Sequence, residues 1–385
     1  MYSRLLSISG ERSIFLFGPR GTGKSTWVKQ TYPNALYFDL LESAVYKRLL
    51  SQPGRLEQYI PKGFDEYVVL DEVQRVPELL NEVHRLIENN HIKFILTGSS
   101  SRKLRRGGYN LLAGRALLHH MYPLTAMEMK GDFQWEKALT QGMLPRAQEP
   151  DFQDYLQSYV RIYLDQEIQQ EGLTRRLDDF SRFLEVASFS QGQVLNTSNV
   201  ARDSEIQRMT VHGYFRILQD LMIGCMVPPF TKRAKRRLVN HPKFYFFDPG
   251  VFRAIRPMGP YDNPQELGGV CLETLVFQQL LAINDLLHLG YTLHYFRTAS
   301  GVEVDFVLYG ERGIIGVEVK LGDHFSDTMT RGLKNFARDY PEAKLYLFYT
   351  GNTKLYIGNI TVLPVRYALP HLSDLLTQLT PTLRG

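Results

Sequence analysis

The sequence predicts an α/β chain in three parts, and two kinds of pattern support this fold class. First, the apolar run Ile14–Phe17 leads into the glycine-rich segment Gly18–Ser25 and then into a helical pattern. Second, the short apolar runs Tyr67–Leu70 and Lys93–Thr97 end in polar residues, as expected of parallel strands buried on both faces. We therefore expect a parallel sheet first, a helical module next, and a second α/β domain at the carboxyl end.

Composition indicates a folded chain of ordinary type. Its 385 residues are enough for two or three domains, and 44% of them are hydrophobic while 22% are charged. Cys225 and Cys271 are far apart and lack metal-type spacing, which favours a reducing compartment. No apolar run of membrane-spanning length and no signal peptide are expected, so the predicted location is the cytoplasm, without a membrane partner. The balance of 45 basic to 40 acidic residues favours an anionic partner only slightly.

The glycine-rich segment matches the phosphate-binding pattern G-x-x-x-x-G-K-[ST]. Its glycines let backbone N–H groups point at phosphate oxygens, Lys24 would reach the β- and γ-phosphates, and Ser25 would be a ligand of Mg²⁺. A plain strand-to-helix turn would explain neither Lys24 nor Ser25. The predicted cofactors are ATP and Mg²⁺, and the predicted binding residues are Gly18, Pro19, Arg20, Gly21, Thr22, Gly23, Lys24, Ser25 and Thr26.

Two later strands are expected to bring polar groups to the same edge of the sheet. After a strand at Ala35–Leu40, the next strand, Tyr67–Leu70, ends in Asp71-Glu72, and carboxyl ends of parallel strands form the ligand crevice. We therefore predict Asp71 as a partner of Mg²⁺ and Glu72 as the group that polarises water. An acidic flank to a helix over Pro77–Glu88 is the alternative.

The strand Lys93–Thr97 runs into Gly98-Ser99-Ser100. A hydroxyl at this strand end would sense the γ-phosphate or orient the attacking water. Thr97 and Ser99 are equal candidates for that role. The alternative is that both are ordinary turn-forming residues.

With these motifs the chain resembles the AAA+ superfamily, and more closely a widespread group of prokaryotic ATPases whose AAA domain precedes a conserved domain of unknown function. The residues that carry the resemblance are Gly18–Ser25, Leu70–Pro77, Leu96–Ser100, Leu111–Arg115 and Tyr122–Thr125. The resemblance covers the chain nearly end to end and implies ATP hydrolysis by an oligomer, with a ring as the expected form. It also implies that Arg115, in a Gly-Arg pair, completes a neighbouring subunit's site; a surface arginine that opens a strand is the alternative.

The ATPase part is expected over residues 1–150 and a winged-helix-like module over 151–262. Helical patterns run over Phe152–Gln170, from Leu173 to Ala187, and over Ser198–Asp203 and Thr210–Met222. Three helices with a tight connection between the second and third are the outline of helix-turn-helix.

A basic segment follows these helices, between the apolar runs Met226–Phe230 and Lys243–Phe247. It carries five cations, which are Lys232, Arg233, Lys235, Arg236 and Arg237. This pattern predicts the tip of a hairpin, or wing, that contacts DNA phosphates without reading sequence. A solvated hairpin tip is the alternative.

The third part, residues 263–385, is expected to be a nuclease-like α/β domain. A helix at Val270–His288 precedes strands at Leu293–Arg297, Val302–Leu308 and Ile314–Val319, then a helix around Leu333 and a strand at Leu345–Tyr349. The order α-β-β-β-α-β resembles the restriction-endonuclease-like fold.

Acidic residues in this part fit the D…(D/E)-x-K arrangement of such nucleases. Asp305 lies in one strand, and Glu318 and Lys320 share one face of the next. In an active enzyme of this type Asp305 and Glu318 would hold Mg²⁺, Lys320 would position water, and Glu273 would add a ligand. The alternative is that amphipathic strands place these charges on a solvent-facing surface, where Glu303 alternates with Asp305.

The sequence thus predicts a Mg²⁺-dependent AAA+ ATPase that binds DNA. Two alternatives remain open: an ATP-dependent nuclease that uses the acidic residues, and a nucleotide-controlled switch or scaffold that binds a protein partner.

Overall fold

The computed structural model describes residues 2–8, 10–99, 104, 114–164, 177–232 and 239–377. They form two compact units. The N-terminal unit comprises Leu6–Pro123 and Asp220–Met222, and the C-terminal unit comprises Met1–Leu5, Leu124–Gln219 and Ile223–Gly385. Apart from Asp220–Met222, the predicted parts 151–262 and 263–385 fall together in the C-terminal unit.

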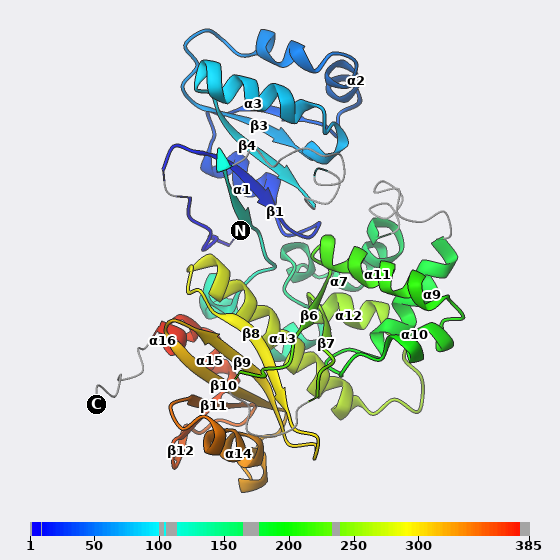
Figure 1. The fold of residues 1–385 in the computed structure, drawn as a ribbon, viewed down its shortest axis with the longest axis vertical. Coiled ribbons are helices and arrows are strands. Elements are labelled where there is room, and N and C mark those ends of the chain that lie inside the picture. Colours follow the sequence, from blue (N-terminus) through cyan, green and yellow to red (C-terminus); the bar gives the residue numbers. More distant parts are fainter. Residues whose placement is uncertain are drawn as a thin grey trace. The chain divides into compact units, whose positions relative to one another are not determined.

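The N-terminal unit is built on a sheet of five parallel strands (Figure 1). Its strands are β1 (Ser13–Phe17), β2 (Leu36–Asp39), β3 (Tyr67–Asp71), β4 (Lys93–Gly98) and β5 (Ala116–His120). The helices are α1 (Lys24–Thr31), α2 (Ser43–Ser51) and α3 (Leu79–Asn90), with 3-10 helices η1 (Pro53–Tyr59) and η2 (Val73–Arg75). The order β2-β3-β4-β1-β5 confirms the predicted parallel sheet and brings the carboxyl ends of β3, β4 and β1 together.

Both faces of this sheet are buried. Phe15, Val68 and Phe94 belong to a core cluster that also contains apolar side chains of α2 and α3. Ile14 and Ile95 alternate with them along their strands and are fully buried on the opposite face. Burial on two faces explains why these strands read as continuous apolar runs in the sequence.

Helices fill the first half of the C-terminal unit. They are α5 (Ala126–Met129), α6 (Trp135–Gln141), α7 (Phe152–Ser158), α9 (Leu177–Ser188), α10 (Thr197–Asp203), α11 (Arg208–Asp220) and α12 (Pro249–Ile255), with 3-10 helices η4 (Lys130–Asp132) and η5 (Pro145–Gln148). The α-helix predicted from residue 152 ends at Ser158, and a π-helical turn, η6 (Tyr159–Leu164), follows it. Tyr159 is buried against the Phe247 ring, so tertiary packing overrides local helix propensity at this point. The remainder of that predicted helix and Leu173 lie outside the described residues.

An aromatic core joins the predicted helix-turn-helix region to the hairpin that follows it. The hairpin consists of β6 (Gly224–Val227) and β7 (Lys243–Phe246), which pair antiparallel. Phe183 of α9 contacts Phe215 of α11 with ring centroids 4.9 Å apart, and Phe215 contacts Phe244 of β7 at 5.0 Å. The predicted order of three helices and a hairpin is therefore present, while its identity as a winged helix stays a prediction.

A mixed sheet of six strands forms the second half of this unit (Figure 1). The strands are β8 (Thr292–Arg297), β9 (Glu303–Gly310), β10 (Gly313–Lys320), β11 (Lys344–Tyr349), β12 (Leu355–Ile357) and β13 (Ile360–Pro364), in the order β12-β13-β11-β10-β9-β8. The helices are α13 (Pro264–Leu286), α14 (Arg331–Asp339), α15 (Val365–Ala368) and α16 (Leu372–Thr377), with a 3-10 helix η7 (Asp327–Thr330). The expected α-β-β-β-α-β order is present, and β12, β13, α15 and α16 extend it.

Helix α13 corrects the expectation that no apolar stretch reaches membrane-spanning length. Within the described parts of the chain, it is the one helix that is long and apolar enough to cross a membrane. However, 67% of the most apolar 18-residue stretch of this helix is buried inside the protein. There, Phe277 contacts Phe306 of β9. A helix that is largely apolar because it is enclosed has the composition of a core helix.

The connection between β6 and β7 extends the six-stranded sheet beyond β8. Phe230 N–H donates to Tyr295 O at 2.7 Å, and Tyr295 N–H donates to Pro228 O at 3.1 Å. On the other arm, Val239 N–H donates to Arg297 O at 3.1 Å. The connection between β6 and β7 is thus hydrogen-bonded to β8 on both of its arms.

Strand β9 contains an irregularity at Asp305. His294 of β8 pairs with Val307 and Phe296 pairs with Val304, so two steps along β8 correspond to three along β9. One extra residue in β9 is a β-bulge, which turns side chains away from simple alternation. Strict alternation therefore does not describe how Asp305 is oriented relative to its strand neighbours.

Candidate functional site

The glycine-rich loop has the backbone that its pattern predicts. Gly21 and Gly23 have φ of 82° and 92°, values that side chains other than glycine rarely adopt. A Cβ atom at Gly18 would overlap the carbonyl oxygen of Met121, so that position has no room for a side chain. The loop therefore depends on glycine for both its conformation and its packing.

Lys24 begins α1 and lies over the loop. Its ammonium donates to Gly18 O at 2.7 Å and to Pro19 O at 3.2 Å. Thr22 Oγ1 donates to the same Pro19 carbonyl at 2.8 Å. The side chain of Lys24 is thus held within the loop at the positive end of a helix, where an anion is favoured.

Asp71 lies beside this loop, at the end of β3, and its partners are hydroxyl groups. Tyr37 donates from its hydroxyl to Asp71 Oδ2, and Thr97 donates from Oγ1 to Asp71 Oδ1. Burial and the hydrogen bond to Asp71 raise the pKa of Tyr37, whose hydroxyl also bonds to Ser25. The network therefore brings Ser25 and Asp71, both predicted metal ligands, to a single tyrosine.

These groups fit Mg²⁺ bound with a nucleotide phosphate. A hydroxyl and a carboxylate are the oxygen ligands that Mg²⁺ prefers, and the glycine loop with Lys24 offers donors to phosphate. The predicted residues Ser25 and Asp71 would hold the ion.

Glu72 follows Asp71 in a left-handed conformation, with φ 62° and ψ 47°. This conformation is uncommon for a residue other than glycine and stores backbone strain. Its N–H donates to Thr97 Oγ1 at 3.2 Å. Thr97 therefore accepts from Glu72 and donates to Asp71, and so links the two acidic residues. The other hydroxyl candidate, Ser99, instead accepts from Gln74.

Gln74 is a residue of this site that sequence reasoning missed. Its Nε2 donates to Glu72 Oε2 at 2.5 Å and to Ser99 Oγ at 3.3 Å. Its Oε1 is buried and has no hydrogen-bond partner among the residues that the structure describes. A Cβ atom at Gly98 would overlap this oxygen, so the glycine at the end of β4 leaves the space that the Gln74 side chain occupies. Its only signal in the sequence is its position, two residues after Glu72.

Arg115 does not lie near Lys24 in its own chain. Ala116, next in sequence, pairs with Ser13 at the start of β1, whereas the phosphate-binding loop follows the other end of that strand. Arg115 forms an ion pair with Glu88, and its side chain is 35% exposed. Ser100 and Leu111–Ala113, which belong to the predicted motifs, lie outside the described residues.

The predicted acidic residues of the C-terminal unit do come together. Lys320 Nζ lies 2.6 Å from Glu318 Oε1 and 4.0 Å from Asp305 Oδ2. Asp305 and Glu318 are only 7% and 6% exposed, which contradicts the alternative of charges on a solvent-facing surface. We call Glu273, Glu303, Asp305 and Glu318 the acidic cluster.

Lys243 completes the acidic cluster and was missed in the sequence. Its ammonium lies 3.1 Å from Glu273 Oε1 and 4.0 Å from Asp305 Oδ1, and it forms an ion pair with Glu303. Lys243 lies in the expected hairpin strand, where its sequence neighbourhood gives no sign of contact with residues 273–305.

Electrostatics in the cluster reflect burial and these pairs. Burial, followed by repulsion from Asp305, raises the pKa of Glu318 to about 8. Burial lowers the pKa of Lys320, but Asp305 and Glu318 outweigh this effect and raise it overall. Burial also lowers the pKa of Lys243, but the nearby negative charges, with Glu273 the strongest, raise it overall.

Of the predicted basic segment, only Lys232 is described. Its Nζ lies 4.4 Å from the centre of the Tyr309 ring, and its carbonyl accepts from Tyr340 OH at 2.7 Å. Arg233, Lys235, Arg236 and Arg237 lie outside the described residues.

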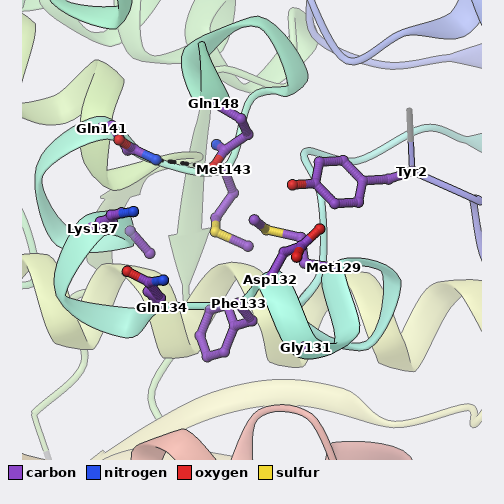
Figure 2. Close-up of a pocket in the computed structure, with 11 residues that line it drawn as sticks. Tyr2, Met129, Gly131, Asp132, Phe133, Gln134, Lys137, Gln141, Met143 and Gln148 are labelled. Carbon is purple, nitrogen blue, oxygen red and sulfur yellow. Dashed lines mark hydrogen bonds between the residues drawn. The ribbon is translucent and has the colours of Figure 1, made fainter. Parts of the chain in front are cut away.

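A pocket of about 250 Å³ opens elsewhere in the C-terminal unit, between Tyr2 and the segment that runs from Met129 to Gln148 (Figure 2). Its polar lining includes Asp132 and Lys137, and Gln141 donates to Gln148 across one wall at 3.0 Å. None of its lining residues belongs to the loop or to the acidic cluster, so it is separate from every predicted site residue.

Three family models match successive parts of the chain. Residues 10–130 match an AAA domain, residues 133–262 match a domain of unknown function (DUF8612), and residues 268–368 match a domain of unknown function (DUF4143). Together with the parallel sheet and the loop, the first match supports an AAA+ ATPase, and the third supports a carboxyl-terminal DUF4143 domain.

No curated protein matches the chain. Among solved structures, the Orc1 protein of Aeropyrum pernix in complex with DNA is 15% identical, with 64% of this chain and 87% of that chain covered and a TM-score of 0.26. Protein VC1899 of Vibrio cholerae is 12% identical, with 96% and 98% covered and a TM-score of 0.24. At these TM-scores neither similarity carries an argument about fold or function.

We predict that Thr97→Val destabilises the nucleotide-free protein by about 1–3 kcal/mol, because it leaves the Glu72 N–H and one oxygen of Asp71 without their partner in a buried site. Urea denaturation would measure the change. Ser51→Ala, which removes an exposed hydroxyl bound to Arg48 O in the same unit, is the matched control. A change no larger than the control's would contradict the hydrogen bonds assigned to Thr97.

Proposed function

We propose that the chain is a Mg²⁺-dependent AAA+ ATPase. The observation that supports this most is the hydrogen-bond network that joins Ser25, Tyr37, Asp71 and Thr97 beside the glycine-rich loop. It brings a hydroxyl and a carboxylate together at the edge of the sheet where doubly wound proteins bind ligands. The match of residues 10–130 to an AAA domain supports the same conclusion.

Each residue would then have a defined part in hydrolysis. Lys24 would donate to phosphate oxygens in place of its present carbonyl partners. Ser25 and Asp71 would hold Mg²⁺, which supplies charge neutralisation at the phosphates when bound. Glu72 would orient the attacking water, while Thr97 keeps the backbone of Glu72 in place and Ser99 stands at the far side of Gln74.

The central experiment compares Lys24→Ala with Glu72→Gln. Lys24→Ala should weaken ATP binding about 10- to 100-fold, since a hydrogen bond to a charged group is removed. Glu72→Gln should keep binding and reduce turnover by about 100-fold or more, because an amide cannot take up a proton from water. Nucleotide affinity and phosphate release would be measured side by side. Exposed Lys47→Ala and Glu78→Gln are the controls, and wild-type turnover in Glu72→Gln would remove Glu72 from the mechanism.

Gln74 is proposed as a positioning residue, because its amide holds the Glu72 carboxylate. Gln74→Ala should lower kcat about 10- to 100-fold with little change in KM, since a misaligned water affects the chemical step more than binding. Exposed Gln52→Ala is the control. A rise in KM with unchanged kcat would argue instead for a role in nucleotide binding.

A role for Arg115 in hydrolysis would belong to a neighbouring subunit's site. Within one chain it precedes a strand that starts beside Ser13, at the end of β1 away from the loop, and it pairs with Glu88. We therefore propose that the protein acts as an oligomer, and a ring is the form that its resemblance to AAA+ proteins implies.

We also propose that the helices α9, α10 and α11 and the hairpin bind DNA. The support is the antiparallel pairing of β6 with β7, which makes residues 228–242 their connection and so puts the basic segment there. Phosphate contacts by such a segment would give affinity without sequence preference.

Replacing Lys235, Arg236 and Arg237 with Gln should therefore weaken DNA binding and flatten its salt dependence, by about one unit of log–log slope for each phosphate that is no longer bound. Titrations at several salt concentrations would measure both. The control replaces Arg331, Lys334 and Arg338, three exposed cations of α14, with Gln. If both triple variants behave alike, net charge and not the hairpin accounts for binding. Binding that is salt-independent in the wild type would favour a switch or scaffold for a protein partner.

The alternative candidate function is an ATP-dependent nuclease, and the contact of Lys320 with Asp305 and Glu318 is the observation in its favour. We rank it below the first because Lys243 already pairs with Asp305, and also with the neighbouring carboxylates of Glu273 and Glu303.

A further inference from the structure

We propose that the Lys243 ammonium takes the place of a divalent cation in the acidic cluster, so that this cluster is a metal-free centre, compensated mainly by side-chain cations, and not a phosphodiester-cleaving site. This inference concerns the C-terminal unit and does not depend on ATP hydrolysis in the N-terminal unit.

The position of the ammonium is the first argument. Lys243 reaches the cluster from β7, and its side chain is only 2% exposed. Its ammonium pairs with three carboxylates, which are Glu273 on α13 and Glu303 and Asp305 on β9. A cation that bridges carboxylates from separate elements is what a bound metal ion provides in other proteins, and here a covalently attached side chain provides it.

The second argument is that most carboxylate oxygens facing this centre are already used. Asp305 Oδ2 accepts from Val319 N–H at 2.8 Å, while Oδ1 faces Lys243. Glu273 Oε1 accepts from both Lys243 and the hydroxyl of Tyr245. Within the described residues, Glu318 Oε2 is the one buried carboxylate oxygen that lacks a hydrogen-bond partner.

The charges lead to the same conclusion. Four carboxylates face three cations, because Lys320 lies at Glu318 and Arg297 lies 3.3 Å from Glu303 in addition to Lys243. A divalent ion bound to the same oxygens would repel the buried ammonium a few ångströms away. No group of three or more His, Cys, Asp or Glu side chains able to hold a metal ion occurs in the parts of the chain that are described.

Moving the Lys243 side chain out of the cluster would also cost a large amount of free energy. Its strand pairs with β6, and the ammonium lies 5.6 Å from the centre of the Tyr295 ring. Its departure would leave Glu273 and Asp305 buried with an uncompensated charge, which is strongly unfavourable.

Metal binding is the first test. The nucleotide-free full-length protein would be titrated with Mn²⁺ by electron paramagnetic resonance, as wild type and as Asp305→Asn. We expect equal numbers of bound ions in both, and any site in the wild type should disappear with Asp71→Asn instead. A Mn²⁺ site that is present in the wild type and absent from Asp305→Asn would overturn the proposal, whatever happens in the N-terminal unit.

Charge compensation is the second test. Lys243→Met should lower the midpoint of thermal unfolding by roughly 10 °C, and Lys243→Met combined with Glu273→Gln should recover part of this loss. Lys334→Met, which breaks a 3.9 Å ion pair with exposed Asp327, is the matched control and should have little effect. If the single variant does not fold, folding of the double variant is the supporting result. An unchanged midpoint in Lys243→Met, or no recovery in the double variant, would contradict the role of counter-ion.

Discussion

A buried carboxylate must find a cation or hydrogen-bond donors, and this constraint organises the C-terminal unit. Glu273 lies on α13, Asp305 on β9 and Lys243 on β7, and the ion pairs among them fix these three elements to one another. The hairpin next to the predicted helix-turn-helix and the mixed sheet therefore share one electrostatic centre. These ion pairs help to hold residues 151–262, apart from Asp220–Met222, and 263–385 in a single compact unit, although two different family models match them.

The N-terminal unit satisfies the same constraint differently. Asp71 is buried, but its described partners are the neutral hydroxyls of Tyr37 and Thr97. Hydroxyl donors stabilise a carboxylate without cancelling its charge, so Asp71 keeps the capacity to attract a cation. Around Asp305, by contrast, two ammonium groups lie 4.0 Å from the carboxylate oxygens and offset the charge. Two buried acidic centres of one chain are thus suited to different tasks, one to binding an ion and one to holding a fold.

The sequence predicted those features that depend on local pattern. The glycine-rich loop, the parallel strands and the positions of Asp71 and Glu72 follow from glycine spacing and apolar runs, which short-range geometry determines. Lys243 could not be predicted as a partner of Glu273, because thirty residues separate them and only the tertiary fold brings them together. Gln74 was missed since its role depends on side-chain contacts with Glu72 and Ser99. The bulge at Asp305 was missed because an extra residue in a strand leaves no mark on its composition.

The attachment of the hairpin to β8 has a consequence for the solubility of this chain. Strand β8 ends the six-stranded sheet, and an end strand offers free N–H and C=O groups to strands of other molecules. Here Pro228, Phe230 and Val239 take up those groups at Tyr295 and Arg297, and the Phe230 ring covers apolar surface next to them. A fragment that starts at residue 263 would expose this strand, and aggregation through edge-to-edge pairing is what such a fragment would undergo.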